Sequence, residues 1–279
     1  MKRFLVLALC LAPFAAFAAA TPQHTAKAAK HGAARSSVPA RLSVAQIISK
    51  NVAARGGLKA WRAVNTLTLS GKLDAGGTEN PDLPFVMKMK RPHKSRLEIR
   101  FQDQTALQVY NGEQGWKVRP FLGRDEVEPY TTAEAREAEA WQELDGPLVD
   151  YAKKGTKISL LGTEVVEGHN TYKLKLALKS GDQRRVWIDA DSFLERKIDG
   201  EPRKMDGKMR NVSIYYRDFK AESGVVVPHV FETFIEGGKE SHKLFIEHVA
   251  INQPMNDSLF MKPDLALVRA AAPQPEGRP

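Results

Sequence analysis

The segment Tyr172-Lys173-Leu174-Lys175-Leu176-Ala177-Leu178 places an apolar residue at every second position. Because successive side chains of a β-strand point to opposite faces, this spacing predicts a strand with one apolar face and one polar face. The shorter segment Leu67-Thr68-Leu69-Ser70 has the same spacing. The apolar face of a sheet built from such strands must be covered, either by the protein's own helices or partly by a bound lipid.

Strand-like patterning extends from about Val64 to Val249 and is interrupted once by a helical segment. The pairs Asn111-Gly112 and Gly237-Gly238 favour tight turns, since these residue types tolerate positive φ. We therefore expect a mainly β chain of antiparallel hairpins. After a first strand that follows Val64, strands are predicted near residues 84–91, 95–102, 105–111, 115–119, 157–161, 164–168, 171–179, 184–190, 193–199, 209–219, 225–236 and 240–250.

Two helical regions are predicted from capping boxes, in which a hydroxyl residue is followed three positions later by Glu or Gln. The first opens with Ser43 and Gln46. The second opens with Thr131 and Glu134 and should restart after residues 146–147. The fold class that accommodates these helices and a one-sided sheet is an open antiparallel β-barrel, a half-barrel whose concave face is lidded by helices.

The first 20 residues have the composition of an export signal. Lys2 and Arg3 precede an apolar run from Phe4 to Leu11, and small residues follow over 16–20. A membrane anchor is the alternative, but it would need about 20 apolar residues, and Pro13 interrupts this stretch. We expect cleavage of the signal peptide, residues 1–20, and a periplasmic mature protein.

The only cysteine, Cys10, lies within this signal. A lipoprotein signal would require a small residue where Leu9 stands. Cleavage would therefore leave a mature protein without a disulfide, a thiolate nucleophile or a cysteine metal ligand.

The remaining chain is predicted to form one domain, residues 42–263, between a basic disordered linker, residues 21–41, and a disordered tail, residues 264–279. The formal net charge of the whole chain is +9. Much of the excess lies in the signal and the linker, and neither a basic recognition helix nor zinc-finger spacing is present. Together with export, this argues against nucleic acid as a partner.

Catalytic and cofactor-binding motifs are absent from the sequence, which contains no Gly-x-Ser-x-Gly, no glycine-rich phosphate loop before a helix and no His-Glu-x-x-His. His242 and His248 share a strand face but would lie about 20 Å apart, too far to share a metal. Asp189 and Asp191 resemble the start of a calcium loop, but Phe193 occupies the next ligand position, which favours a simple turn. We expect no enzyme activity, no metal and no cofactor.

Alternation also identifies the side chains that share the apolar face. Each acyl methylene moved out of water contributes ~0.8 kcal/mol, so even a partly buried chain can bind there without a polar anchor. The alternative is that the same side chains form a closed core. The candidate ligand-binding residues are Leu67, Leu69, Phe85, Met87, Met89, Leu97, Ile99 and Phe101 from strands, with Trp141, Leu144 and Leu148 from the helical segment.

A membrane-spanning barrel would also contain alternating strands, but its outer band must be uniformly apolar. Charges on the polar faces, such as Lys88 with Lys90 and Glu232 with Glu236, instead favour a soluble half-barrel.

Several segments resemble a known family in their turns and apolar positions. They are Asp218-Phe219-Lys220, Gly224–His229, Asn252–Phe260, Val186–Ala190 with Leu194–Arg196, Gly56–Trp61 and Tyr110–Trp116. They resemble the outer-membrane lipoprotein-sorting proteins, the LolA/LolB family, over nearly the whole mature domain. RseB, a periplasmic regulator, shares this fold.

The resemblance implies a half-barrel whose apolar concave face receives the acyl chains of a lipid or lipoprotein, in a monomer with a transient membrane-protein partner. In LolA an arginine helps to hold the lid shut, and no arginine here matches its position. The lipid anchor of LolB also has no counterpart. Two roles stay open, a carrier in lipoprotein sorting and a sensor that contacts an inner-membrane signalling protein.

Overall fold

The computed structural model describes residues 42–74, 82–141, 143–205, 207–238 and 241–266. The predicted signal peptide, the linker and most of the predicted tail lie outside these residues. The strands are β1 (Thr66–Asp74), β2 (Asp82–Lys90), β3 (Lys94–Phe101), β4 (Gln104–Tyr110), β5 (Gly115–Arg119), β6 (Arg124–Pro129), β7 (Lys157–Val166), β8 (His169–Ala177), β9 (Gln183–Asp189), β10 (Glu195–Asp199), β11 (Arg203–Met205), β12 (Lys208–Arg210), β13 (Val212–Glu222), β14 (Val225–Ile235) and β15 (His242–Ile251). The helices are α1 (Val44–Ala54), α2 (Leu58–Ala63) and α3 (Thr132–Trp141), with short 3-10 turns η1 (Pro120–Leu122) and η2 (Asp257–Phe260).

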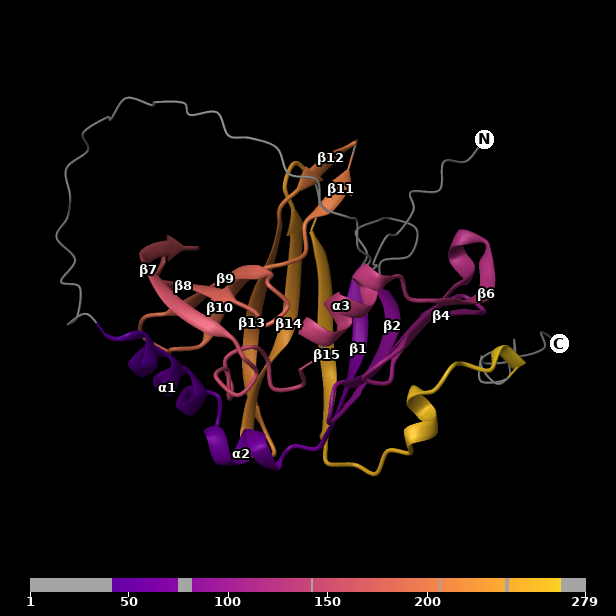
Figure 1. Ribbon diagram of the computed structural model, residues 1–279, viewed down its shortest axis with the longest axis horizontal. Helices are drawn as coiled ribbons and strands as arrows, with labels where there is room; N and C mark the ends of the chain where they lie inside the picture. The colour runs from indigo at the N-terminus through magenta and orange to yellow at the C-terminus, as the bar shows by residue number, and fades with distance from the viewer. Residues whose placement is uncertain (1–41, 75–81, 142, 206, 239–240, 267–279) are drawn as a thin grey trace.

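Thirteen of these strands form one antiparallel sheet in the order β6-β5-β4-β3-β2-β1-β15-β14-β13-β10-β9-β8-β7. The two edge strands, β6 and β7, do not pair with each other, so the sheet stays open. The predicted half-barrel is therefore confirmed. In Figure 1 the strands β1, β15, β14 and β13 form the tall centre of this sheet.

Some strands differ from the predicted ones. Residues 157–166 form the single strand β7, in which the pairing register shifts between Leu160 and Gly162, where two strands were expected. β6 and the hairpin β11–β12 were not predicted. β6 lies at the sheet edge and its residues are exposed or half-buried, so no alternation of apolar and polar residues marks it.

Both capping boxes are confirmed. The Ser43 hydroxyl accepts from the Gln46 backbone N–H, and the Thr131 hydroxyl accepts from the Glu134 backbone N–H. The predicted restart after residues 146–147 does not form a helix. Gly146 has φ +77° and Asp150 has φ +51°, and these left-handed conformations turn the chain instead.

The helices cover the concave face of the sheet, as expected. Ile47 and Ile48 of α1 pack with Leu174 and Ile188, which alternation places on the apolar face of β8 and β9. Glu134 holds α3 over β5 through a buried ion pair with Lys117. Within the described ranges, each helix falls short of the length and apolar character that crossing a bilayer would require.

The turn between α1 and α2 is fixed to the sheet. The backbone N–H of Val226 on β14 donates to the carbonyl oxygen of Arg55 at 2.9 Å. The two backbones approach so closely that a Cβ on Gly56 would lie 2.4 Å from the carbonyl oxygen of Gly224. Glycine is therefore required here, where φ is also +101°.

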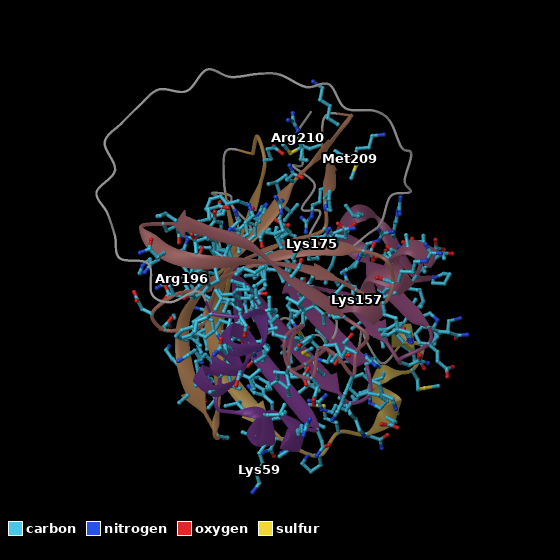
Figure 2. The ribbon with its side chains drawn as sticks, turned by 60° about the vertical axis from the view of Figure 1, so that its left-hand side comes forward. Lys59, Lys157, Lys175, Arg196, Met209 and Arg210 are labelled. Carbon is cyan, nitrogen blue, oxygen red and sulfur yellow. The ribbon has the colours of Figure 1, made fainter. Side chains whose placement is uncertain are left out.

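Two features lie away from the concave face. Phe260 of η2 is buried against Leu107, Val109 and Val118, which face the opposite side of the sheet. The hairpin β11–β12 extends beyond the upper end of the sheet, where Figure 2 labels Met209 and Arg210.

Candidate functional site

The concave face of β1, β2 and β3 carries a continuous apolar surface. Leu69 lies opposite Met87 in the register, and Met87 lies opposite Leu97 on the next strand. The neighbouring rows pair Leu67 with Met89 and Phe85 with Ile99. Because paired residues of antiparallel strands share a face, these side chains project to the same side of three adjacent strands.

Most of the predicted lining residues meet in one apolar cluster. Six are buried there, namely Leu67, Leu69, Phe85, Met89, Ile99 and Leu144. Met87, Leu97 and Phe101 pack against the same cluster and are half-buried. Leu148 belongs instead to the second cluster, with β8 and β9, and the side chain of Trp141 lies outside the described residues. Their role in binding a ligand stays a prediction.

Residues 143–156, named here the lid segment, close over this face. Their apolar side chains Leu144, Leu148 and Val149 are buried. Val149 and Leu144 enter the first cluster and Leu148 enters the second, so the lid segment joins the two apolar clusters. With the lid segment in this position, the lining residues form the core predicted as the alternative.

A charged cleft of about 680 Å³ lies beside the lid segment. Its walls come from the lid segment, the end of α2, the turn between β2 and β3, helix α3 and the turn between β8 and β9. Five strands separate β2 from β9 in the sheet, so the cleft bridges the two halves of the half-barrel. Of the predicted lining residues, Leu144 alone lines it.

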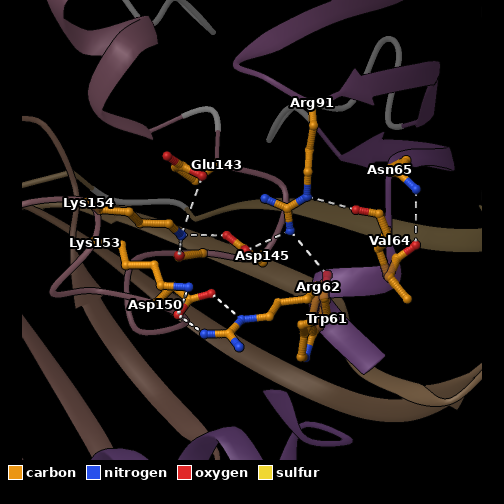
Figure 3. Close-up of polar contacts among 12 residues, drawn as sticks. Trp61, Arg62, Val64, Asn65, Arg91, Glu143, Asp145, Asp150, Lys153 and Lys154 are labelled. Carbon is orange, nitrogen blue, oxygen red and sulfur yellow. Dashed lines mark hydrogen bonds and ion pairs between the residues drawn. The ribbon is translucent and has the colours of Figure 1, made fainter. Parts of the chain in front are cut away.

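Asp145 is the centre of the ion-pair network that holds the lid segment (Figure 3). Its side chain is only 3% exposed and accepts from Arg91 Nη2 at 2.7 Å and from the Lys154 ammonium. Its backbone carbonyl accepts from Arg55 Nη1 at 2.9 Å. Arg91 also donates through Nε to the carbonyl oxygen of Val64, at 2.8 Å, which joins the lid segment to the chain entering β1.

A second contact holds the middle of the lid segment. Arg62 of α2 donates to both carboxylate oxygens of Asp150, through Nε at 2.7 Å and Nη2 at 2.6 Å. This bidentate hydrogen bonding lowers the pKa of the Asp150 carboxyl to about 2. The Arg62 side chain is 48% exposed, so water can compete for this pair more readily than for Asp145.

These charged residues were not identified from the sequence. Three arginines, Arg55, Arg62 and Arg91, contact the lid segment. A partial signal was available, since Asp145 stands beside Leu144 and close to Leu148 in an otherwise apolar stripe. A buried carboxylate requires a charged or hydrogen-bonding partner. Two of its partners, Arg55 and Arg91, lie 90 and 54 residues away in the sequence, and only Lys154 is near, at nine residues.

Across the described ranges, no three His, Cys, Asp or Glu side chains are grouped so that they could hold a metal ion. Asp189, considered above for calcium, accepts instead from the backbone N–H groups of Asp191 and Ser192, which is the arrangement of a turn.

Comparison with known proteins relates the chain to others by fold. No protein-family profile matches its sequence, and no curated protein sequence does so significantly. Among solved structures, a putative outer membrane lipoprotein-sorting protein domain from Vibrio parahaemolyticus matches with a TM-score of 0.51 and 11% identity, over 80% of this chain and 97% of that chain.

Two further structures match similarly. A LolA superfamily protein from Nitrosomonas europaea has a TM-score of 0.52 and 14% identity, over 80% of this chain and 99% of that chain. A DUF1329 family protein from Desulfovibrio piger has a TM-score of 0.52 and 13% identity, over 78% and 97%. The chain therefore has a LolA-like fold, as the resemblance of its sequence segments indicated.

Proposed function

We propose that this LolA-like chain is an exported periplasmic binding protein that holds the acyl chains of a lipid or lipoprotein against its concave face, for envelope lipoprotein sorting or transport. The observation that carries the proposal is the apolar surface across β1, β2 and β3 beneath a lid segment that is held at its rim by ion pairs. A carrier needs a cover that can be displaced.

The energies of displacement and loading are comparable. Burial of Leu144, Leu148 and Val149 stabilises the closed lid by ~1.5–3 kcal/mol each, so lifting all three costs roughly 5–9 kcal/mol. An acyl chain that buries about ten methylenes in their place contributes ~8 kcal/mol. The acyl chain can therefore replace the lid residues on the concave face, with the ion pairs setting the balance.

The test is uptake of a fluorescent fatty acid by the chain purified from the periplasm, together with native mass spectrometry. The test variant is Met87→Gln/Leu97→Gln, because these two lining residues are only half-buried and the fold should survive their replacement. The matched control is Phe234→Gln/Phe245→Gln, which removes two exposed apolar side chains elsewhere on the sheet. We expect the test variant to lose at least tenfold in affinity and the control to keep the affinity of the unaltered protein.

Three results would count against acyl binding. They are a purified mass equal to the bare chain with no saturable uptake, equal losses in the two variants, and an unchanged affinity of Met87→Gln/Leu97→Gln. Crosslinking in cells separates the two biological roles. Transient adducts with lipoproteins support the carrier, whereas a stable adduct with an inner-membrane signalling protein would replace it with the sensor.

A further inference from the structure

The charged cleft has more cationic than anionic side chains. Six Lys or Arg residues line it, against three Asp or Glu residues. The acids are all engaged: Asp145 with Arg91 and Lys154, Asp150 with Arg62 and Lys153, and Glu143 with Lys154. The cleft therefore retains cationic groups beyond those that its own carboxylates neutralise.

The cationic side chains that no described carboxylate neutralises lie on two separate walls of the cleft. Arg136 extends from α3 and Lys179 from the turn between β8 and β9, and both are exposed. Neither has an ion-pair partner among the residues that the structure describes. An anionic group between them would face two cations that have no carboxylate partner among the described residues.

The cleft also touches both apolar clusters. Leu144 lines the cleft and belongs to the first cluster, while Leu178 lines it and packs against the second. Each cluster therefore has one apolar side chain at the wall of the cleft, next to which the apolar chain of a molecule with an anionic group in the cleft could lie. A molecule with one anionic group and one apolar chain is an amphiphile.

We propose that the charged cleft binds the phosphate or carboxylate headgroup of the amphiphile whose acyl chain occupies the concave face. The inference rests on the proposed function and specifies its ligand as an anionic amphiphile. Arg136 and Lys179 contact the headgroup first. Because a phosphate or carboxylate presents Arg with the same acceptor geometry as Asp, the headgroup then competes with Asp145 and Asp150 for Arg91 and Arg62, which frees the lid segment.

The test compares two lipids with the same single acyl chain, a lysophospholipid with an anionic phosphoglycerol headgroup and a monoacylglycerol whose headgroup is uncharged. Affinities are measured by calorimetry below the micelle threshold, with inorganic phosphate as a third ligand. The variant is Arg136→Gln/Lys179→Gln, which leaves every ion pair of the lid segment in place. The matched control is Arg210→Gln/Lys59→Gln, an Arg and a Lys that do not line the cleft and that Figure 2 labels at opposite ends of the molecule.

We expect the unaltered protein to bind the anionic lipid at least tenfold more tightly than the uncharged one. The preference should fall about tenfold in Arg136→Gln/Lys179→Gln, with the affinity for the uncharged lipid unchanged, and should persist in the control. Added salt should weaken the preference, since the contacts are exposed.

The failures are distinguishable. Equal affinity for the two lipids would overturn the headgroup site and leave acyl binding standing. Absence of binding by either lipid would overturn the proposed function and the headgroup site with it. Saturable binding of inorganic phosphate, with no preference between the lipids, would assign the cleft to a soluble anion instead. If the preference falls equally in the control variant, the net charge of the protein explains the preference, and the headgroup site is overturned.

Discussion

Replacement of Asp145 by Asn should loosen the lid segment without unfolding the sheet. Asn is nearly isosteric with Asp but carries no charge, so it leaves Arg91 and Lys154 without their shared carboxylate. Removing one partner of a fully buried ion pair costs about 3–5 kcal/mol. The Arg91 side chain is 29% exposed and can recover some hydration, so we expect a lower cost, about 2–3 kcal/mol.

This cost should appear in hydrogen exchange of the lid segment. The backbone N–H of Gly155 donates to Ala152 and that of Thr156 donates to Tyr151, so these amides report lid opening. A change of 2–3 kcal/mol corresponds to exchange that is about 30- to 150-fold faster, while amides within β8 should keep their protection. Because loading as proposed requires the lid to open, Asp145→Asn should also raise the apparent affinity for an acyl ligand.

The control is Asp257→Asn. Asp257 likewise pairs with two lysines, Lys90 and Lys94, but its side chain is 58% exposed. We expect no change in lid exchange for this variant. Unchanged lid exchange in Asp145→Asn would show that the ion pairs do not hold the lid. Equal acceleration in the lid and in β8 would show that the residue stabilises the whole fold and not the lid.

Two further substitutions test particular contacts. Arg62→Gln should lower the melting temperature by a constant amount above about pH 4. The difference from the unaltered protein should disappear as the pH falls toward 2, because the folded-state pKa of Asp150 lies below its unfolded value and protonation removes the ion pair. A difference in melting temperature that persists at pH 2 would contradict this prediction. Gly56→Ala should lower the free energy of unfolding in urea by about 3 kcal/mol or more, since the new Cβ would overlap the Gly224 carbonyl. Gly57→Ala has a similar φ of +92° but no described atom near the new Cβ, so it should cost only about 1–2 kcal/mol. Equal costs would mean that φ alone explains both.

Local sequence patterns predicted most helices and strands because they reflect interactions between residues that are close in the sequence. The hydroxyls of Ser43 and Thr131 accept from backbone N–H groups three residues away, so four consecutive residues are enough to predict each of these helix starts. The apolar positions of β2 follow from period two within one strand. β6 has neither signal, because an exposed edge strand is specified by pairing with β5 rather than by its own side chains.

The candidate site divides in the same way. The apolar face could be predicted, since residues that alternate within β1, β2 and β3 necessarily share a side. The charged cleft could not. Arg62 and Arg91 are ordinary charged residues in the sequence, where solvation explains each of them, and their contacts with Asp150 and Asp145 appear only when the chain brings them within hydrogen-bonding distance.

The sequence by itself determined which side chains lie on the apolar side of most strands, where α1 and α3 begin and that the sheet needs a cover, because these depend on neighbours within a few residues. Only the tertiary structure decided that β6 and β7 stay apart, that the lid segment joins the two apolar clusters and that three arginines meet it. Electrostatic and packing energies depend on distances between residues far apart in the chain, and no local pattern encodes those distances.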